Sequence, residues 1–581
     1  MKALSEIRHI ETDVLIVGAG VAGMLAVVGA KRAGISPIIA TKGAYASGSS
    51  SMARGGHSIA VGHSSPDDNP KIFFEDIVKG SHGIGNPRLI DVVAEESLAR
   101  SAELDAWGLG LVKDEKGHYD QKPGGAPHRY DRLVHCGRLM GKPLMNALST
   151  KTKSWGTEPL THVMFVDLMM ENGRVVGAWG FTYREGTPVV IHAKSTVIAA
   201  GGAPQIHALN DSPPTITGDG YAMAYRAGAD LIDMEFIDYQ IVTAAPEKLA
   251  GYPPYSTGLL GAGGHLLNGE GERFMAKYDP ENMEHSSRAL TNRAMALEVF
   301  EGRATDKGNI QIDVRHIYDK VNDGPAAGVL ATFAKAGLDL ANDCLEVTSC
   351  PHTYLGGIRI DEWGRTNLDG LYVGGEAAGG IHGANRLGGL ALIDSYVFGL
   401  RSGMAAALES KSEEVPDRES GNWREGLNKL DERVSRGGTS LSPEAWRKEV
   451  QSQIVTNLGQ VRREDRLLEG LDKLNELERQ FEDIEVSGKT DRQRFECLRL
   501  TLETHNLICV GRMLGTAALA RTESRGGHFR LEHPEEDENF LGNLIIRREG
   551  DTCAADFQPV PPRDRIAAPP PGEAVTDLDL M

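Results

Sequence analysis

One arginine, Arg386, lies in the middle of a run of small residues, HGANRLGGLALID, which extends from His382 to Asp394. Glycines have no side chain, so they let a backbone come close to another molecule. A guanidinium group in such a place can hold a carboxylate or a phosphate, because its planar fork matches two oxygen atoms at once. These residue types and their spacing predict a site where an anion lies beside a second, closely packed molecule.

A second glycine pattern predicts a nucleotide site near the N-terminus. Gly18, Gly20 and Gly23 form GxGxxG directly after the apolar run DVLIV at residues 13–17 and at the start of a helical stretch. In this setting the glycines permit a tight turn and admit a pyrophosphate, to which the start of the helix offers unpaired N–H groups. We therefore expect a dinucleotide to bind here.

The end of the second predicted strand, GISPIIA at residues 34–40, favours FAD over free NAD. An acidic residue commonly follows this strand and binds a ribose hydroxyl group, but Thr41 and Lys42 stand there. The ribose must then be bound in another way, or Lys42 binds a phosphate. A later strand that ends in a glycine pair, STVIAAGG at residues 195–202, also favours FAD.

The composition is that of a large globular enzyme. The chain has 581 residues, too many for one core, and a net charge of −19, so we expect two to four domains and no broad nucleic-acid binding. Its 6 cysteines form no C-x-x-C pair, which predicts reduced thiols and no metal site. The N-terminus resembles no signal peptide, and no apolar run is long enough to span a membrane, so we expect a cytoplasmic protein.

Hydrophobic patterns predict an α/β fold with a discontinuous, Rossmann-like nucleotide domain. Its first part covers residues 1–234, an inserted α+β domain covers 235–350, and the strand pattern returns in 351–415. Residues 416–535 are charged and helical, and the apolar residues that recur from Leu467 to Ile484 favour core packing over a coiled coil. Because prolines are dense near its end, residues 536–581 are predicted to form an extended tail.

Several motifs occur in an order that resembles one enzyme family. They are TGDG at 217–220, GERFM at 271–275, HTYLGG at 352–357, GLYVGGEAAGGIHGANRLGG at 370–389 and RTESRGGHFR at 521–530. From about residue 10 to about 550, the chain resembles the flavoprotein subunit of the succinate dehydrogenase/fumarate reductase family, which also includes soluble fumarate reductases and L-aspartate oxidase. The resemblance implies a capping domain over FAD, hydride transfer between the flavin and a carbon beside a carboxylate, and, for the electrons, a separate iron–sulfur subunit.

The resemblance also implies functions for single residues. Arg386 and His352 would bind a substrate carboxylate, and Arg288 would transfer the proton through a relay, because an arginine seldom loses its proton alone. The residues by themselves leave other interpretations open: Arg288 as a surface partner of Glu284, His352 as a turn residue, and Glu376 as a residue that favours a helix start. The residues that match FAD contacts of the family are Gly18, Gly20, Gly23, Thr41, Lys42, Ser49, Gly55, Gly56, Gly201, Asp219, Glu376, Ala391 and Leu392.

The sequence departs from the family at the substrate. The family reads E-F-x-Q-F-H where this chain reads EFIDYQ, so Gln240 replaces the histidine that binds the second carboxylate. The family reads T-E-x-x-R-G-E-G-G where this chain reads STGLLGAGG, which keeps Ser256 as a substrate-binding residue but places Thr257 and Leu260 at the acid and the arginine of the relay. A larger or less charged unsaturated acid therefore fits better than fumarate, since glutamine carries no charge.

These departures leave more than one function open. The leading hypothesis is a flavoprotein subunit that acts on a CH–CH bond beside a carboxylate. The alternatives are an enzyme like L-aspartate oxidase and a flavin electron-transfer component whose substrate site has decayed. The retained Arg288, His352 and Arg386 argue against decay. With the relay residues replaced, the proton would come from water, from Tyr239 or from His265.

FAD is expected to bind without a covalent bond. Membrane-bound members attach it through a histidine a few residues before a glycine pair, and counting back from Arg54, Gly55 and Gly56 that place holds Ser49. Acid precipitation should therefore release all of the yellow flavin into the supernatant. A pellet that stays yellow after washing would contradict this prediction.

Overall fold

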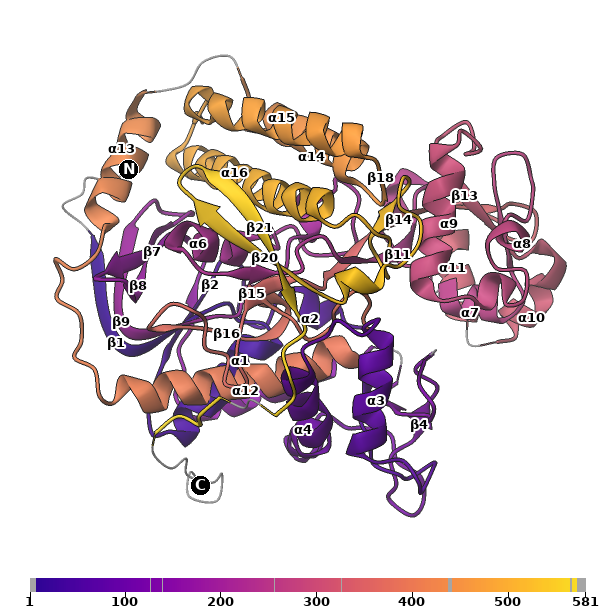
Figure 1. Cartoon of the computed structure of the whole chain (residues 1–581), viewed down its shortest axis with the longest axis horizontal. Helices are drawn as coiled ribbons and strands as arrows, with labels where there is room; N and C mark the ends of the chain where they lie inside the picture. The colour runs from indigo at the N-terminus through magenta and orange to yellow at the C-terminus, as the bar shows by residue number, and fades with distance from the viewer. Residues whose placement is uncertain are drawn as a thin grey trace.

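The computed structural model forms a large body with a smaller lobe at one side (Figure 1). The structure describes residues 7–125, 127–137, 139–254, 256–324, 326–436, 441–564 and 567–571, without the side chains of Ser256 and Thr257. In this described part of the chain, every helix is too short or too polar to cross a membrane.

The body is built around a seven-stranded sheet in the order β6-β2-β1-β9-β8-β7, with β16 also paired to β9. Neighbours β6, β2, β1 and β9 are parallel, as are β9 and β16, whereas β7 and β8 form an antiparallel hairpin. The predicted strand DVLIV is the buried end of β1. The bounds are β1 (Arg8–Val17), β2 (Ile38–Thr41), β6 (Leu160–Thr161), β7 (Val163–Glu171), β8 (Arg174–Thr182), β9 (Pro188–Ile198) and β16 (Leu371–Val373).

Two helices, α1 (Val21–Arg32) and α12 (Leu390–Ser410), pack closely against each other beside this sheet. Glycines make the close approach possible, because a Cβ atom on Gly403 would lie 2.1 Å from the carbonyl oxygen of Ala26. The other helices of the body are α2 (Ser49–Met52), α3 (Pro70–Gly80), α4 (Pro87–Ala106), α5 (Gly141–Ser154) and α6 (Asp219–Ala227), and a small sheet joins β3 (His57–Ser58), β5 (Leu133–Val134) and β4 (Gln121–Lys122).

The lobe is the inserted α+β domain, which we call the cap. Its antiparallel sheet has the order β11-β14-β13-β12, and its own core contains the fully buried Leu266, Ile312 and Phe333. Strand β14 extends beyond residue 350, where the sequence placed the end of this domain. The bounds are β11 (Ile237–Thr243), β12 (His265–Leu267), β13 (Ile310–Asp313), β14 (Leu345–Tyr354), α7 (Ser256–Gly261), α8 (Met275–Tyr278), α9 (Arg288–Phe300), α10 (Tyr318–Asn322) and α11 (Ala327–Lys335).

The C-terminal helices are α13 (Trp423–Arg436), α14 (Pro443–Leu458), α15 (Glu464–Arg479) and α16 (Asp491–Ala520). Helices α14, α15 and α16 lie side by side over the body (Figure 1). Leu467, Leu474 and Leu477 of α15 are buried in the main core together with residues of α14 and α16. The apolar stripe is therefore core packing within the chain, as the sequence favoured.

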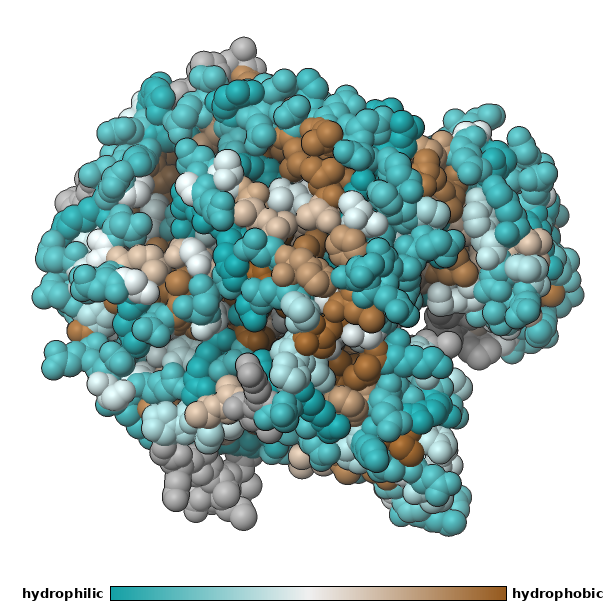
Figure 2. Space-filling model, viewed as in Figure 1, coloured by the Kyte–Doolittle hydropathy of each residue, from teal (hydrophilic) through white to brown (hydrophobic). Residues whose placement is uncertain are grey.

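The prediction of an extended tail from residue 536 is wrong for residues 542–559. These residues form the hairpin of β20 (Gly542–Glu549) and β21 (Thr552–Pro559). Leu544, Ile545 and Ile546 are buried, because β20 pairs with β10 (Leu231–Ile232) in a sheet that also contains β15 (Gly357–Arg359) and β17 (Ala378–Gly379). The proline-rich sequence begins only where the hairpin ends. On the side of the molecule seen in Figure 1, hydrophobic residues gather in the middle of a surface that is otherwise mostly hydrophilic (Figure 2).

The contact between α1 and α12 predicts the effect of one added methyl group. Gly403→Ala should lower the free energy of unfolding by about 1–3 kcal/mol, because the new Cβ atom collides with backbone atoms of α1. Urea unfolding measures this loss. Gly261→Ala is the matched control, since a Cβ atom at Gly261 meets nothing within 4 Å, and it should cause no loss. Equal unfolding curves for the two variants would refute the packing argument.

Candidate active site

The glycine motif forms a cradle at the carboxyl ends of parallel strands. Gly18 has a φ of +115°, and a Cβ atom on it would lie 2.1 Å from the carbonyl oxygen of Ala199 after β9. Gly20 precedes α1 without a side-chain cap, and Ser50 of α2 accepts a hydrogen bond from the Val21 N–H at 3.2 Å. A turn that excludes side chains and a helix start that faces the sheet edge fit the pyrophosphate of a dinucleotide.

Lys42, directly after β2, holds a carboxylate on each side. Its Nζ atom lies 2.7 Å from Asp219 at the start of α6 and 2.7 Å from Glu503 on α16. Burial alone would lower the pKa of Lys42, but the two carboxylates outweigh it and raise the pKa. Both carboxylates already pair with Lys42, so the arrangement gives no support to a phosphate bound by Lys42.

Glu376 connects the second glycine-rich segment to strand β14. Its Oε1 atom accepts a hydrogen bond from the Tyr354 N–H at 3.0 Å, and a Cβ atom on Gly202 would lie 2.4 Å from that oxygen. Burial raises the pKa of Glu376 to about 7. The other residues predicted to bind FAD have these places: Thr41 ends β2, Ser49 begins α2, Gly55 and Gly56 precede β3, Gly201 follows β9, and Ala391 and Leu392 lie in the first turn of α12.

One carboxylate joins the two arginines that the sequence singled out. Oδ2 of Asp238, on β11, lies 2.5 Å from a guanidinium nitrogen of Arg288 and 2.8 Å from one of Arg386. The side chains of Asp238 and Arg386 are 4% and 6% exposed, whereas that of Arg288 is 35% exposed. The cap supplies Asp238 and Arg288, and the body supplies Arg386, so this ion-pair cluster connects the two domains.

Arg288 is the first residue of α9, where the helix dipole disfavours a positive charge. Ser287 caps this helix by accepting a hydrogen bond from the Leu290 N–H at 3.2 Å. Asp238 offsets the unfavourable charge of Arg288. The alternative pairing of Arg288 with Glu284 is wrong, because Glu284 pairs with Arg273 at 2.5 Å.

His352 projects from an irregularity in β14. Asp238 pairs with Thr353 and Tyr239 pairs with Pro351, so His352 is the extra residue of a β-bulge, a feature that redirects side chains near active sites. Its Nδ1 atom lies 2.8 Å from Oδ2 of Asp211. The bulge and this hydrogen bond fix the ring beside the arginine cluster.

The charges in this cluster support one another. Burial alone would raise the pKa of Asp238, but Arg288, Arg386 and His352 outweigh it and hold the pKa below its ordinary value. Asp238 is therefore ionised at neutral pH and neutralises part of the charge on both guanidinium groups. A negatively charged ligand meets arginines that already share a carboxylate.

Other residues named from the sequence lie elsewhere or are not described. Leu260 packs into the apolar core of the cap, and its aliphatic side chain has no group that could relay a proton. His265 lies on β12 and stacks on His316 with ring centroids 4.1 Å apart. Gln240 is half-buried on β11, two residues after Asp238. The predicted contact of Ser256 falls on a side chain outside the described part of the structure.

Sequence reasoning missed two acidic residues, Asp238 and Asp211. Asp238 left a signal, because a charged residue in the buried strand EFIDYQ stands where the family pattern has glutamine. Asp211 left none that could be recognised, since it lies 141 residues before its partner His352.

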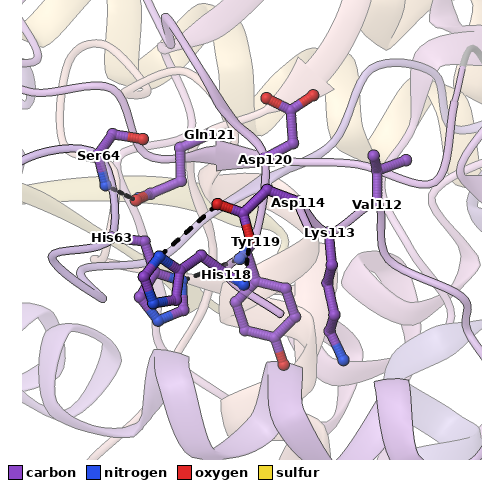
Figure 3. A pocket seen from close by; sticks show the side chains of 9 residues that line it. All are labelled: His63, Ser64, Val112, Lys113, Asp114, His118, Tyr119, Asp120 and Gln121. Atoms are coloured by element: carbon purple, nitrogen blue, oxygen red, sulfur yellow. Dashed lines mark hydrogen bonds and ion pairs between the residues drawn. The ribbon is translucent and has the colours of Figure 1, made fainter. Parts of the chain in front are cut away.

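A cavity of about 320 Å³ is lined by residues from other parts of the chain (Figure 3). Its lining comes from residues 63–64 and 112–121, and none of the predicted site residues is part of it. His63 and His118 stack there with ring centroids 4.6 Å apart. Among the residues that the structure describes, no three His, Cys, Asp or Glu side chains are grouped so that they could hold a metal ion.

Comparison with known proteins agrees with this architecture. Residues 13–392 match the family model of the FAD binding domain, and residues 447–571 match that of the fumarate reductase flavoprotein C-terminal domain. The chain is thus an FAD-dependent oxidoreductase of the class that acts on CH–CH groups. It belongs to the family of succinate dehydrogenase and fumarate reductase flavoprotein subunits.

Relatives match along nearly the whole chain. One subunit of the fumarate reductase (CoM/CoB) of Methanothermobacter marburgensis is 35% identical over 551 residues, which cover 93% of this chain and 97% of that protein. A mitochondrial succinate dehydrogenase flavoprotein subunit of Xenopus laevis is 31% identical and covers 90% of this chain and 80% of its own length. The solved structure of Mycobacterium smegmatis Sdh1 has a TM-score of 0.87 at 29% identity, with 96% of both chains covered.

The raised pKa of Glu376 predicts a pH-dependent difference in stability. The protonated form is favoured in the folded protein up to about pH 7, so the contribution of Glu376 to stability is lost as the pH rises from the ordinary carboxyl range through 7. Glu376→Gln removes this ionisation. The free energy of unfolding of the variant minus that of the original protein should therefore be larger at pH 8 than at pH 5, by up to about 3 kcal/mol. Urea unfolding of both proteins at the two pH values measures it; a constant difference would contradict the prediction.

Proposed function

We propose that this chain transfers a hydride between FAD and the carbon–carbon double bond of an unsaturated carboxylic acid. The observation that carries the proposal is the convergence of Arg386, Arg288 and His352 around Asp238, from three separate segments of the chain. Arginine and histidine in one partly exposed site are suited to bind a carboxylate. The names of the relatives, fumarate reductase and succinate dehydrogenase, support the same reaction type.

Each residue has a distinct task in this proposal. Arg386 and His352 bind the carboxylate and draw electron density toward it, which stabilises the enolate-like charge that develops next to it. Arg288 exchanges the proton with the neighbouring carbon, and its partly exposed side chain can reach both a ligand and water. FAD, when bound, supplies or accepts the hydride. The residues predicted from the sequence to bind it remain a proposal, supported by the cradle at Gly18 and the helix start at Gly20.

The electron partner is proposed to be a separate iron–sulfur subunit, in the cytoplasm or attached to a membrane through partner subunits. The relatives support this, because they are named as subunits. The absence of a C-x-x-C pair from the sequence also supports a cluster in another chain. Purification of the flavoprotein with its neighbours in the cell would identify such a protein.

Arg386→Lys tests the carboxylate clamp. The variant should keep its flavin but lose roughly two orders of magnitude in the rate at which an unsaturated acid reoxidises the reduced flavin, because lysine cannot reproduce the guanidinium fork. Anaerobic stopped-flow absorbance with a panel of unsaturated acids measures this rate. Arg401→Lys is the matched control on α12, where Arg401 pairs with Glu96 at 2.5 Å, and it should react like the original protein.

Other outcomes would identify the alternative functions. Hydrogen peroxide formed with aspartate would indicate an enzyme like L-aspartate oxidase. No response to any acid would indicate an electron-transfer component without a substrate. A near-normal rate in Arg386→Lys would show that this residue does not bind the carboxylate.

A further inference from the structure

A single oxygen atom of Asp238 forms the ion pairs with both arginines. This atom, Oδ2, lies within hydrogen-bond distance of Arg288 and of Arg386, and only 4% of the Asp238 side chain is exposed. A buried carboxylate between two guanidinium groups is held firmly, because each partner would lose a charge-assisted hydrogen bond if it moved. Asp238 therefore acts as a fixed counter-ion within the site.

The cluster keeps one unused donor for a ligand. The Nε–H of Arg386 is buried and has no hydrogen-bond partner among the described residues. A buried donor without a partner is unfavourable unless a ligand or water accepts its hydrogen. Arg386 thus shares one nitrogen with Asp238 and still offers another to an incoming carboxylate.

The charges of the site are already nearly balanced before a substrate enters. Two guanidinium groups, Arg288 and Arg386, face the carboxylate of Asp238, and a second carboxylate, Asp211, contacts His352 at 2.8 Å. One substrate carboxylate can share Arg386 and His352 with these acids. A second one would add a further negative charge to a partly buried cluster, where like charges repel each other more strongly than in water.

The position that would receive a second carboxylate has lost its charge, because Gln240 stands where the family pattern has a histidine. Leu260, at the position of the relay arginine, packs with Leu259 and Ile241 in the apolar core of the cap and supplies no cation either. The strand that carries Gln240 also carries Asp238, so this strand presents an acid to the site and no cation. Strand β11 therefore offers no cation to a second carboxylate, and its Asp238 carries a negative charge that repels one.

We propose that Asp238 determines the charge of the substrate, so that the site accepts a monocarboxylic unsaturated acid and disfavours a dicarboxylic one. This inference rests on the proposed function, because it specifies the acid that Arg386 and His352 bind. Asp238 already supplies the two arginines with a negative charge, the one that a second substrate carboxylate would otherwise bring.

Two acids of equal length provide the test. Crotonate and fumarate share the double bond and one carboxylate and differ only in a methyl group against a second carboxylate. Each is titrated into the oxidised, flavin-loaded protein, and the change in the flavin absorbance spectrum gives a Kd without turnover. The original protein should bind crotonate at least as tightly as fumarate.

The variant Asp238→Asn removes the charge and keeps the shape. It should shift the ratio of the two Kd values toward fumarate by about tenfold or more, because two guanidinium groups lose their internal counter-ion. Asp230→Asn is the matched control. It removes the same charge from an ion pair with Arg547 at 2.9 Å and should leave the ratio unchanged. If Asp238→Asn does not fold with flavin, the ratio in the original protein decides the question.

Three results would overturn the inference. One is a fumarate Kd below that of crotonate in the original protein. The second is a ratio that Asp238→Asn leaves unchanged, including the case where both acids bind more tightly by the same factor. The third is a spectrum that neither acid changes, which also overturns the proposed function. In the first two cases, loss of binding in Arg386→Lys shows that Arg386 binds the substrate carboxylate although Asp238 does not select the charge of the substrate.

Discussion

The carboxylate that Arg288 and Arg386 share is the interaction on which the proposed active site depends. Asp238 lies on the strand that enters the cap, Arg288 begins a helix of the cap, and Arg386 belongs to the body. The pairing therefore aligns the two domains and positions the two cations at the same time. A buried charge is tolerated only when it is paired and hydrogen-bonded, so the positions of these three residues depend on one another.

The rest of the fold supplies the rigid support that this cluster needs. Parallel strands β1, β9 and β16 end beside the glycine cradle. The packed helices α1 and α12 fix the two glycine-rich segments that precede them. Lys42 ties β2 to α6 and α16 through two carboxylates. On the side of the cap, the bulge that places His352 forms in the same strand pair that carries Asp238. A site made from loop and strand ends can be precise because each end is anchored in a buried element.

Membership of the family and the identity of the substrate depend on different parts of the molecule. The nucleotide domain, the cap and the C-terminal helices follow the pattern of the relatives along nearly the whole chain. At the substrate, the balance of charge differs from the family pattern, since EFIDYQ brings an acid and a neutral amide where the pattern has an amide and a histidine. A fold of this kind can therefore keep hydride chemistry while a few side chains change which acid enters.

The sequence by itself determined the nucleotide domain, the insertion and the helical C-terminal part, because local periodicity and glycine spacing encode them directly. It also singled out Arg386 as a candidate site residue, because a guanidinium group stands there among glycines. Only the tertiary structure showed that residues 542–559 form a hairpin, since their buried face needs the distant strand β10 as a partner. Only the tertiary structure brought Asp211 to His352 and Asp238 to both arginines. Ion pairs between residues far apart in the chain have no local signature: the spacing in sequence says which side chains are present, and the packing of the domains decides which of them meet.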